Sequence, residues 1–180
     1  VVLYFNDKDY TATVSATGEW SVDIPSGDIP AGDYAATVKV TATDAAGNVD
    51  SITDSFRVDT VVPAGPDAES YTRDHTGFRG ISIAMTDDAI DIAHVAADGT
   101  IREVSATGTD IPALGETFFS FTPTVPDGSH LIITATDDAG NMSGTFVAMD
   151  DLTTSVVNIA TPGLGAYQIE TIDLQFAEDS

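Results

Sequence analysis

Apolar and polar side chains alternate over several stretches in the first third of the chain. Tyr10–Val14 and Trp20–Ile24 place apolar residues at every second position, and the longer run Tyr34–Thr43 is followed by a second alternating run, Val49–Val58. Alternation with a period of two is typical of a β-strand that buries one face. These four stretches are therefore predicted to be strands, and Trp20 is expected to lie in the core rather than to stack on a ligand.

A short motif joins the last two of these strands and occurs a second time. Thr41–Asn48 reads Thr-Ala-Thr-Asp-Ala-Ala-Gly-Asn, and 93 residues later Thr134–Asn141 repeats seven of these eight residues. Both copies lie between β-branched or aromatic runs, so each is predicted to be the turn of a β-hairpin. The spacing suits modules of immunoglobulin size, which have about 100 residues. In the strand after the first copy, Ile52, Phe56 and Val58 are the predicted inward positions.

The second part of the chain has the same character. Ile81–Met85, Leu131–Thr136 and Ser143–Ala148 are predicted strands, and Asp98-Gly99 between two alternating segments predicts a further hairpin. No stretch of about ten residues carries apolar side chains at helical spacing. The predicted fold class is all-β, with tandem immunoglobulin-like β-sandwich modules joined by short linkers.

Module boundaries follow from the prolines and glycines after the first repeat. Asp59–Pro66 contains two prolines and one glycine and is expected to be a short, stiff linker. The sequence predicts one immunoglobulin-like module over residues 1–59, whose first strands are expected to precede Val1, and a second over residues 60–151. Residues 152–180 are expected to begin a following module or to form a connector.

The charge balance excludes some partners. The 180 residues include 29 acids and 6 bases, a net charge of −23, so nucleic acids and anionic membrane surfaces would be repelled. Of the acids, 23 are Asp and 6 are Glu. Asp favours turns and holds its oxygens close to the backbone, where loops bind hard cations such as Ca²⁺. A turn-rich β protein also accumulates Asp in its turns, which is the alternative explanation.

Other site chemistry finds little support. The chain has no cysteine, hence no disulfide or thiolate site, and it has no apolar run of about 18 residues, so no membrane insertion is expected. His75, His94 and His130 lie in unrelated sequence contexts. The paired carboxylates Asp87 and Asp88 are a possible acid and base, but they lie on a short loop. The chain is therefore not expected to be an enzyme or to bind an organic cofactor.

A metal ion is the better candidate ligand, because acidic loops recur at the expected module ends. Ca²⁺ takes about six to eight oxygen ligands from such loops. Asp44 and Asp59 are expected to approach each other at the module junction, where Asp87-Asp88 can join them. The alternative is that Asp44 and Asp137 only cap their turns. The candidate calcium ligands are Asp44, Asn48, Asp59, Asp87, Asp88, Asp137, Asp138, Asn141, Asp150 and Asp151.

Several segments of the first module together resemble a known family. They are Tyr10–Val14, Gly18-Glu-Trp-Ser-Val22, Gly32-Asp-Tyr34, Thr41–Asn48 and Val58-Asp-Thr60 followed by Pro63. In this combination they are similar to the bacterial immunoglobulin-like repeats of giant surface adhesins, of the biofilm-associated and repeats-in-toxin types. The resemblance covers nearly all of residues 1–150. The second module departs from it by lacking the Trp and by ending in Met149-Asp-Asp-Leu152.

The resemblance implies a structural role. Such repeats form a rod, stiffened by Ca²⁺, that projects a distal adhesive domain from the cell for surface attachment or biofilm formation, and the adhesins are secreted. The partners are then the neighbouring modules of the same long chain. The implied junction ligands are Asp44 and Asp59 in the first module. In the second module they are Asp137 and either Asp150 or Asp151.

Two other functions are compatible with the sequence. One is a module that binds a glycan or a host protein through loops such as Tyr71–Phe78 or Phe118–Phe121, which would require exposed aromatic side chains. The other is an accessory module of a secreted enzyme that degrades polysaccharides.

Overall fold

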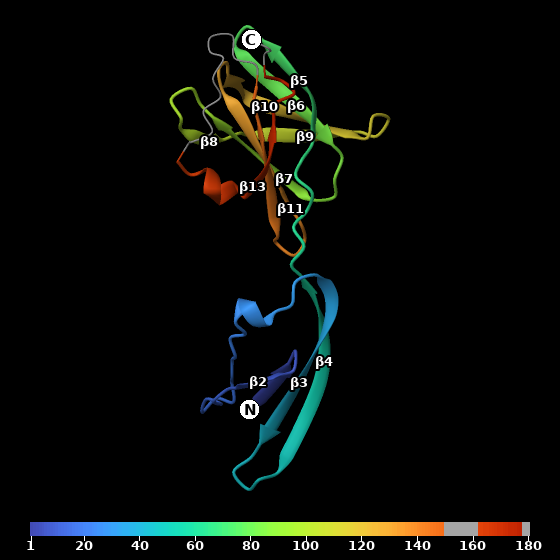
Figure 1. The fold of residues 1–180 in the computed structure, drawn as a ribbon, viewed down its shortest axis with the longest axis vertical. Helices are drawn as coiled ribbons and strands as arrows, with labels where there is room; N and C mark the ends of the chain where they lie inside the picture. The colour runs from blue at the N-terminus through green and yellow to red at the C-terminus, as the bar shows by residue number, and fades with distance from the viewer. Residues whose placement is uncertain (150–161, 178–180) are drawn as a thin grey trace. The chain divides into compact units, whose positions relative to one another are not determined.

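The computed structural model describes residues 1–149 and 162–177, which divide into two compact units, Val1–Val61 and Val62–Ser180 (Figure 1). The all-β prediction is confirmed, because nearly all regular structure is β-strand. The helical elements among the described residues are two short 3₁₀ turns, η1 (Ser26–Asp28) and η2 (Leu164–Tyr167). No described segment forms a helix long and apolar enough to cross a bilayer.

Unit 1 is built on one antiparallel sheet with the strand order β2-β1-β3-β4. Its strands are β1 (Val2–Phe5), β2 (Lys8–Thr11), β3 (Asp33–Thr43) and β4 (Val49–Asp59). The two long strands form the hairpin that the first copy of the motif predicts (Figure 1). The alternating segment Trp20–Ile24 does not form a strand; it lies in the connection between β2 and β3.

The sheet of unit 1 has one apolar and one polar face, as alternation requires. Leu3 is paired with Val40, and Val40 with Ile52, so these side chains share the face on which Phe5 and Ala36 are buried. The inward placement of the β4 side chains agrees with prediction, yet Ile52 remains 67% exposed and Phe56 45% exposed.

Trp20 is 38% exposed, so its expected place in the core is wrong. The physical reason is the same as for the apolar β4 residues. Within residues 1–61 the described strands form a single sheet, and there is no second sheet in this range to bury its apolar face.

Unit 2 is a sandwich of two sheets, with strand orders β5-β6-β10-β9 and β13-β12-β11-β7-β8. The first sheet contains β5 (Ala68–Asp74), β6 (Gly77–Ala84), β9 (Ala106–Ile111) and β10 (Glu116–Pro126). The second contains β7 (Ala89–Val95), β8 (Ile101–Glu103), β11 (His130–Thr136), β12 (Met142–Val147) and β13 (Ile169–Asp173). Asp98-Gly99 turns between β7 and β8, as predicted.

The core of unit 2 lies between the two sheets. Phe78 and Ile81 from β6 pack with Phe121 from β10 against Leu131 and Ile133 from β11, and all five side chains are buried. A face of each sheet is thus removed from water, which is the main source of stability for a sandwich of this size.

A second apolar cluster lies on the outer face of the second sheet. Ile132 and Phe146 point away from the main core and are buried by Leu164, Tyr167 and Ile169 of the C-terminal segment. This explains why Leu131-Ile132-Ile133 is continuously apolar, because a strand covered on both faces needs no polar side.

The C-terminal segment differs from its expected role as a connector or the start of a new module. Its described part, residues 162–177, packs into unit 2, where β13 adds in parallel to the edge of β12. The pairing depends on Gly144, because a Cβ there would lie 2.2 Å from the Tyr167 carbonyl oxygen. The reason for the difference is the apolar outer face of β11 and β12, which must be covered by some segment of the chain.

Candidate functional site

The first copy of the repeated motif forms a tight turn closed by its own aspartate. The Asp44 N–H donates to the Asn48 carbonyl oxygen over 3.0 Å, and the Gly47 N–H donates back to the Asp44 carbonyl oxygen over 3.1 Å. Gly47 has a φ of +87°, in the left-handed region that favours glycine. This is a three-residue hairpin loop that ends in a left-handed glycine, which explains the Gly-Asn pair in the motif.

The side chain of Asp44 completes the turn. Its Oδ1 accepts hydrogen bonds from the N–H groups of Ala46 (2.9 Å) and Asn48 (2.8 Å), and its Oδ2 accepts one from the Asn48 Nδ2 (2.7 Å). Three donors thus hold both carboxylate oxygens. The capping role that the sequence left as an alternative is the role that these contacts describe.

The second copy reproduces the first bond for bond. Asp137 Oδ1 accepts from the N–H groups of Ala139 (2.9 Å) and Asn141 (2.8 Å), and its Oδ2 accepts from the Asn141 Nδ2 (2.9 Å). Gly140 has a φ of +88°. The flanking strands also agree in register, since Thr43 opposite Val49 corresponds to Thr136 opposite Met142. The repeat is therefore a repeat of structure.

These hydrogen bonds lower the pKa of both aspartates. The bond from the Asn48 amide, followed by those from the backbone, lowers the pKa of Asp44. The bond from the Asn141 amide likewise lowers the pKa of Asp137. A lowered folded-state pKa means that the turns add stability when the pH is above the unfolded value of about 4, and that this contribution is lost as the pH falls through the folded value.

We expect this loss to be measurable in unit 2. In Asp137→Asn the melting temperature should fall at pH 7, and its decrease between about pH 5 and pH 3 should be shallower than in the native chain, because an amide does not titrate. Thermal unfolding at a series of pH values tests this. Asp138→Asn, one residue along the same turn, is the control and should retain the native pH profile; equal profiles for all three chains would contradict the assignment.

Asp44 and Asp59 do not come together, so that expectation is wrong. Asp44 follows β3 at one end of the hairpin, whereas Asp59 ends β4 at the other end, opposite Asp33. Each strand has 11 residues, and with a rise of about 3.4 Å per residue the two ends lie roughly 30 Å apart. The physical reason is that β3 and β4 are paired over their whole length, so acids fifteen residues apart lie at opposite ends.

Asp59 instead belongs to an ion-paired group that the sequence did not reveal. The Arg57 guanidinium makes a two-point contact with Asp33, with Nε–Oδ1 at 2.6 Å and Nη2–Oδ2 at 2.5 Å, and it lies 3.9 Å from Asp59 Oδ2. Asp59 Oδ1 accepts the Val61 N–H over 3.0 Å. The bond from Arg57 lowers the pKa of Asp33. Aligning the two strands outward from the turn pairs Asp33 with Asp59, and this alignment is how the sequence could have indicated the ion-paired group.

The loop with Asp87 and Asp88 and the turn with Asp137 are brought close together in unit 2. β7 begins at Ala89 opposite Thr136, the last residue of β11. The loop with Asp87 and Asp88 and the turn with Asp137 therefore leave neighbouring strands at the same end of the sheet, where strands lie about 5 Å apart. Asp88 Oδ2 accepts a hydrogen bond from the Thr86 hydroxyl over 2.8 Å.

The fit to calcium is therefore partial. Among residues 1–149 and 162–177, no group of three or more acids or histidines is arranged to hold a metal ion. Asp44 with Asn48 and Asp137 with Asn141 do not fit, because three internal donors already occupy each of these two carboxylates. The end of the sheet with Asp88 and Asp138 provides two other carboxylates, too few to supply the about six to eight oxygens that Ca²⁺ takes. Asp150 and Asp151, also predicted ligands, lie outside the described residues.

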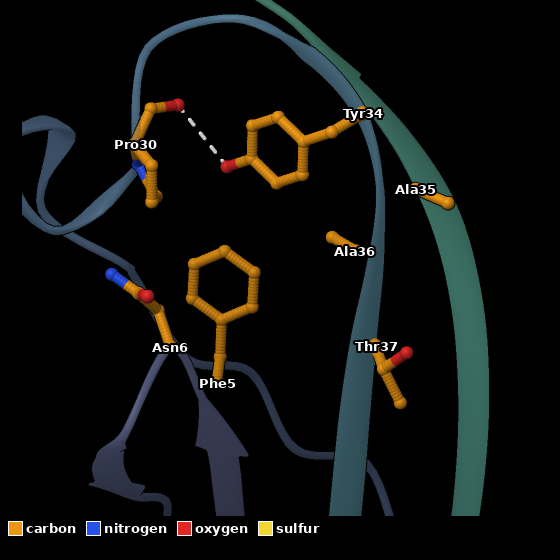
Figure 2. Close-up of a pocket in the computed structure, with 7 residues that line it drawn as sticks. All are labelled: Phe5, Asn6, Pro30, Tyr34, Ala35, Ala36 and Thr37. Carbon is orange, nitrogen blue, oxygen red and sulfur yellow. Dashed lines mark hydrogen bonds between the residues drawn. The ribbon is translucent and has the colours of Figure 1, made fainter.

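A hollow in unit 1 offers little chemistry. It has a volume of about 230 Å³ and lies between Phe5 and Asn6 of one strand end and the segment from Pro30 to Thr37 (Figure 2). The Tyr34 hydroxyl points across it and donates to the Pro30 carbonyl oxygen over 3.1 Å. Tyr34 is its one titratable side chain, and this hydrogen bond already engages the phenol, so the hollow is mainly an incompletely filled part of the apolar face.

A second cavity, of about 490 Å³, lies in unit 2 between Gly65–Asp67 and β12–β13. Thr145 lines it, and its buried hydroxyl has no hydrogen-bond partner among the described residues. The carboxylate of Asp173 accepts bonds from the backbone N–H and the side-chain amide of Gln175, both over 2.9 Å.

The aromatic residues proposed as a ligand platform are mostly structural. Phe78 and Phe121 are buried in the core of unit 2. The Tyr71 ring packs edge-on against Phe78 at 5.5 Å and against Phe176 at 5.1 Å. Such packing is typical of aromatic side chains in a core, and it argues against a binding platform on these loops.

The comparison with known protein families gives a match for unit 1. Residues 1–60 match the family model described as bacterial Ig-like domain. That range coincides with the first compact unit, Val1–Val61. A comparison of the chain with curated proteins finds no match. The first unit is thus similar to bacterial Ig-like domains, which agrees with its β architecture, while residues beyond it are characterised by their structure alone.

Proposed function

We propose that this chain is a structural extender segment of a large secreted bacterial adhesin, which holds a distal adhesive domain away from the cell surface. The observation that carries the proposal is the repeated hairpin, which has the same turn, hydrogen bonds and register in both units. The similarity of unit 1 to bacterial Ig-like domains supports it. An array of similar β units has a natural use in spacing, because its length grows with the number of units.

Calcium is part of this proposal, at a different place from the one first expected. The end of the sheet with Asp88 and Asp138 is the arrangement in unit 2 that favours a divalent cation, because the loop and the turn that carry these two carboxylates leave adjacent strands there. The net charge of −23 adds long-range attraction for cations. A bound ion would also offset the repulsion between these acids.

Thermal unfolding and small-angle scattering with and without Ca²⁺ test the proposal. We expect millimolar Ca²⁺ to raise the melting temperature of unit 2 and to increase the largest particle dimension, with reversal by EDTA. Asp88→Asn should abolish the rise. Asp44→Asn is the matched control, since it weakens the same kind of turn without a second acid on the neighbouring strand. If Ca²⁺ changes neither observable, the calcium part is wrong; if the particle is compact with or without Ca²⁺, the extender role is wrong.

The alternative of a ligand-binding module has weaker support. It requires exposed aromatic side chains on the loops near Tyr71–Phe78 and Phe118–Phe121, and Phe78 and Phe121 are buried. No specific observation favours the accessory module of an enzyme.

A further inference from the structure

The cavity of about 490 Å³ in unit 2 is framed by three segments of that unit. Gly65–Asp67 form one side, Thr145 contributes from β12, and residues 171–174 form the other side. The two sides are tied together, because the Gln175 side-chain amide donates a hydrogen bond to the Ala68 carbonyl oxygen. The cavity is therefore part of the folded sandwich.

The Thr145 hydroxyl is the feature of this cavity that calls for a ligand. The residue is 1% exposed, and its Oγ1 has no hydrogen-bond partner among the described residues. Thr145 lies opposite Thr171 in the ladder between β12 and β13. A Cβ at Gly65 would lie 3.1 Å from the Thr145 Oγ1 and 3.2 Å from the Thr171 Oγ1. Both hydroxyls thus face the glycine, and a buried hydroxyl without a partner costs free energy that a polar ligand would recover.

The charged residues of the cavity give the sign of the ligand. Asp67 and Asp173 line it, and none of its described lining residues is Lys, Arg or His. Side chains that accept hydrogen bonds and carry negative charge select a ligand that donates hydrogen bonds and is positively charged. Pro66, Ile172 and Leu174 add apolar surface, which suits an alkyl chain attached to that charge.

The size of the cavity favours an organic cation over a bare metal ion. A single water molecule needs roughly 10–15 Å³ of such space, far less than the volume present. Two carboxylates are also fewer oxygens than the about six to eight that Ca²⁺ takes. A primary ammonium group has three N–H donors and no acceptor, so a hydroxyl oxygen and a carboxylate are suitable partners for it.

We propose that this cavity binds a small primary alkylammonium compound. Its ammonium group donates to the Thr145 hydroxyl oxygen and to the Asp67 carboxylate, and its alkyl chain lies against Ile172 and Leu174. The site is separate from the acids Asp88 and Asp138, and it depends neither on calcium binding there nor on the extender role.

Titration of the full chain with diaminobutane at pH 7 tests the proposal, because amines of this kind are charged at that pH. Butanediol is the matched neutral probe of the same length, and sodium chloride keeps the ionic strength constant. Backbone amide shifts in nuclear magnetic resonance locate the binding. We expect saturable shifts at Gly65, Asp67, Thr145 and Thr171 with the diamine and none with the diol.

Three variants separate the cavity from the general acidity of the chain. Thr145→Val should weaken diamine binding about tenfold and raise the melting temperature of the ligand-free chain, because the unpartnered hydroxyl is gone. Asp67→Asn, at an exposed residue, should weaken binding about fivefold. Glu170→Gln is the control: it makes the same change of charge at an exposed residue of β13 and should retain native affinity.

Four results would overturn the proposal. Shifts that do not saturate, or that spread over acids throughout the chain, would show general attraction to a surface of net charge −23. Native affinity in both Thr145→Val and Asp67→Asn would place the diamine elsewhere. Equal binding of butanediol would make the ligand a neutral polyol. Competitive displacement of the diamine by Ca²⁺, with shifts at the same amides, would make the cavity a metal site instead.

Discussion

Gly144→Val is expected to detach β13 from β12 and to destabilise unit 2 by about 3 kcal/mol. A Cβ at this position would lie 2.2 Å from the Tyr167 carbonyl oxygen and 3.1 Å from the Ile169 Cδ1. The first contact is with backbone, which cannot rotate away, so the C-terminal segment must move. Its displacement exposes Phe146 and Ile132, which are buried only as long as that segment covers them.

Urea denaturation measures the loss, and hydrogen exchange locates it. In the valine variant, the backbone amides at position 144 and at Ala148 should lose the protection that their bonds to Gln168 and Asp173 provide. Gly165→Ala is the control in the same segment, because a Cβ there meets nothing within 4 Å. Native stability in the valine variant would mean that β13 contributes little to unit 2.

Phe78→Ala should cost about 4 kcal/mol, the other large effect in this protein. The Phe78 side chain is fully buried between the sheets and packs against Tyr71. Its removal leaves a cavity that strands on both sides cannot close, because each is fixed by its own ladder of hydrogen bonds. The free energy of unfolding therefore loses both the transfer of the ring and its packing contacts.

Phe56→Ala in unit 1 is the matched comparison and should cost about 1 kcal/mol or less, since this ring is 45% exposed. The fluorescence of Trp20, the single tryptophan of the chain, follows unit 1 alone, and hydrogen exchange at Leu131–Ile133 follows unit 2. A large effect of Phe56→Ala would contradict the open apolar face of unit 1. A small effect of Phe78→Ala would contradict the position of the core.

Local patterns predicted local structure well. The Thr-Ala-Thr-Asp repeat predicted both hairpins because its glycine and aspartate specify the turn by themselves. The alternation in Tyr34–Thr43 and Val49–Val58 predicted which side chains share a face. Alternation failed for Trp20–Ile24, because a period of two shows that a strand is possible but not that a neighbour exists to pair with it.

Longer-range relations were not accessible in the same way. The position of Asp59 relative to Asp44 depends on strand register over the whole hairpin, and fifteen residues of sequence separation do not indicate it. The role of residues 162–177 depends on the outer face of β11. That signal was present in the continuous apolar run Leu131-Ile132-Ile133, which is typical of a strand covered on both faces.

The late position of β13 in the chain has a consequence for the order of folding during synthesis. Strands β5 to β12 are complete once residue 147 has emerged, yet Ile132 and Phe146 remain uncovered until residues 164–173 follow. A nascent chain that pauses in this interval presents a sheet with an open edge and an apolar outer face, the combination that favours chaperone capture or aggregation. The rate of synthesis between these two points should therefore influence the yield of folded protein more than a pause before β5.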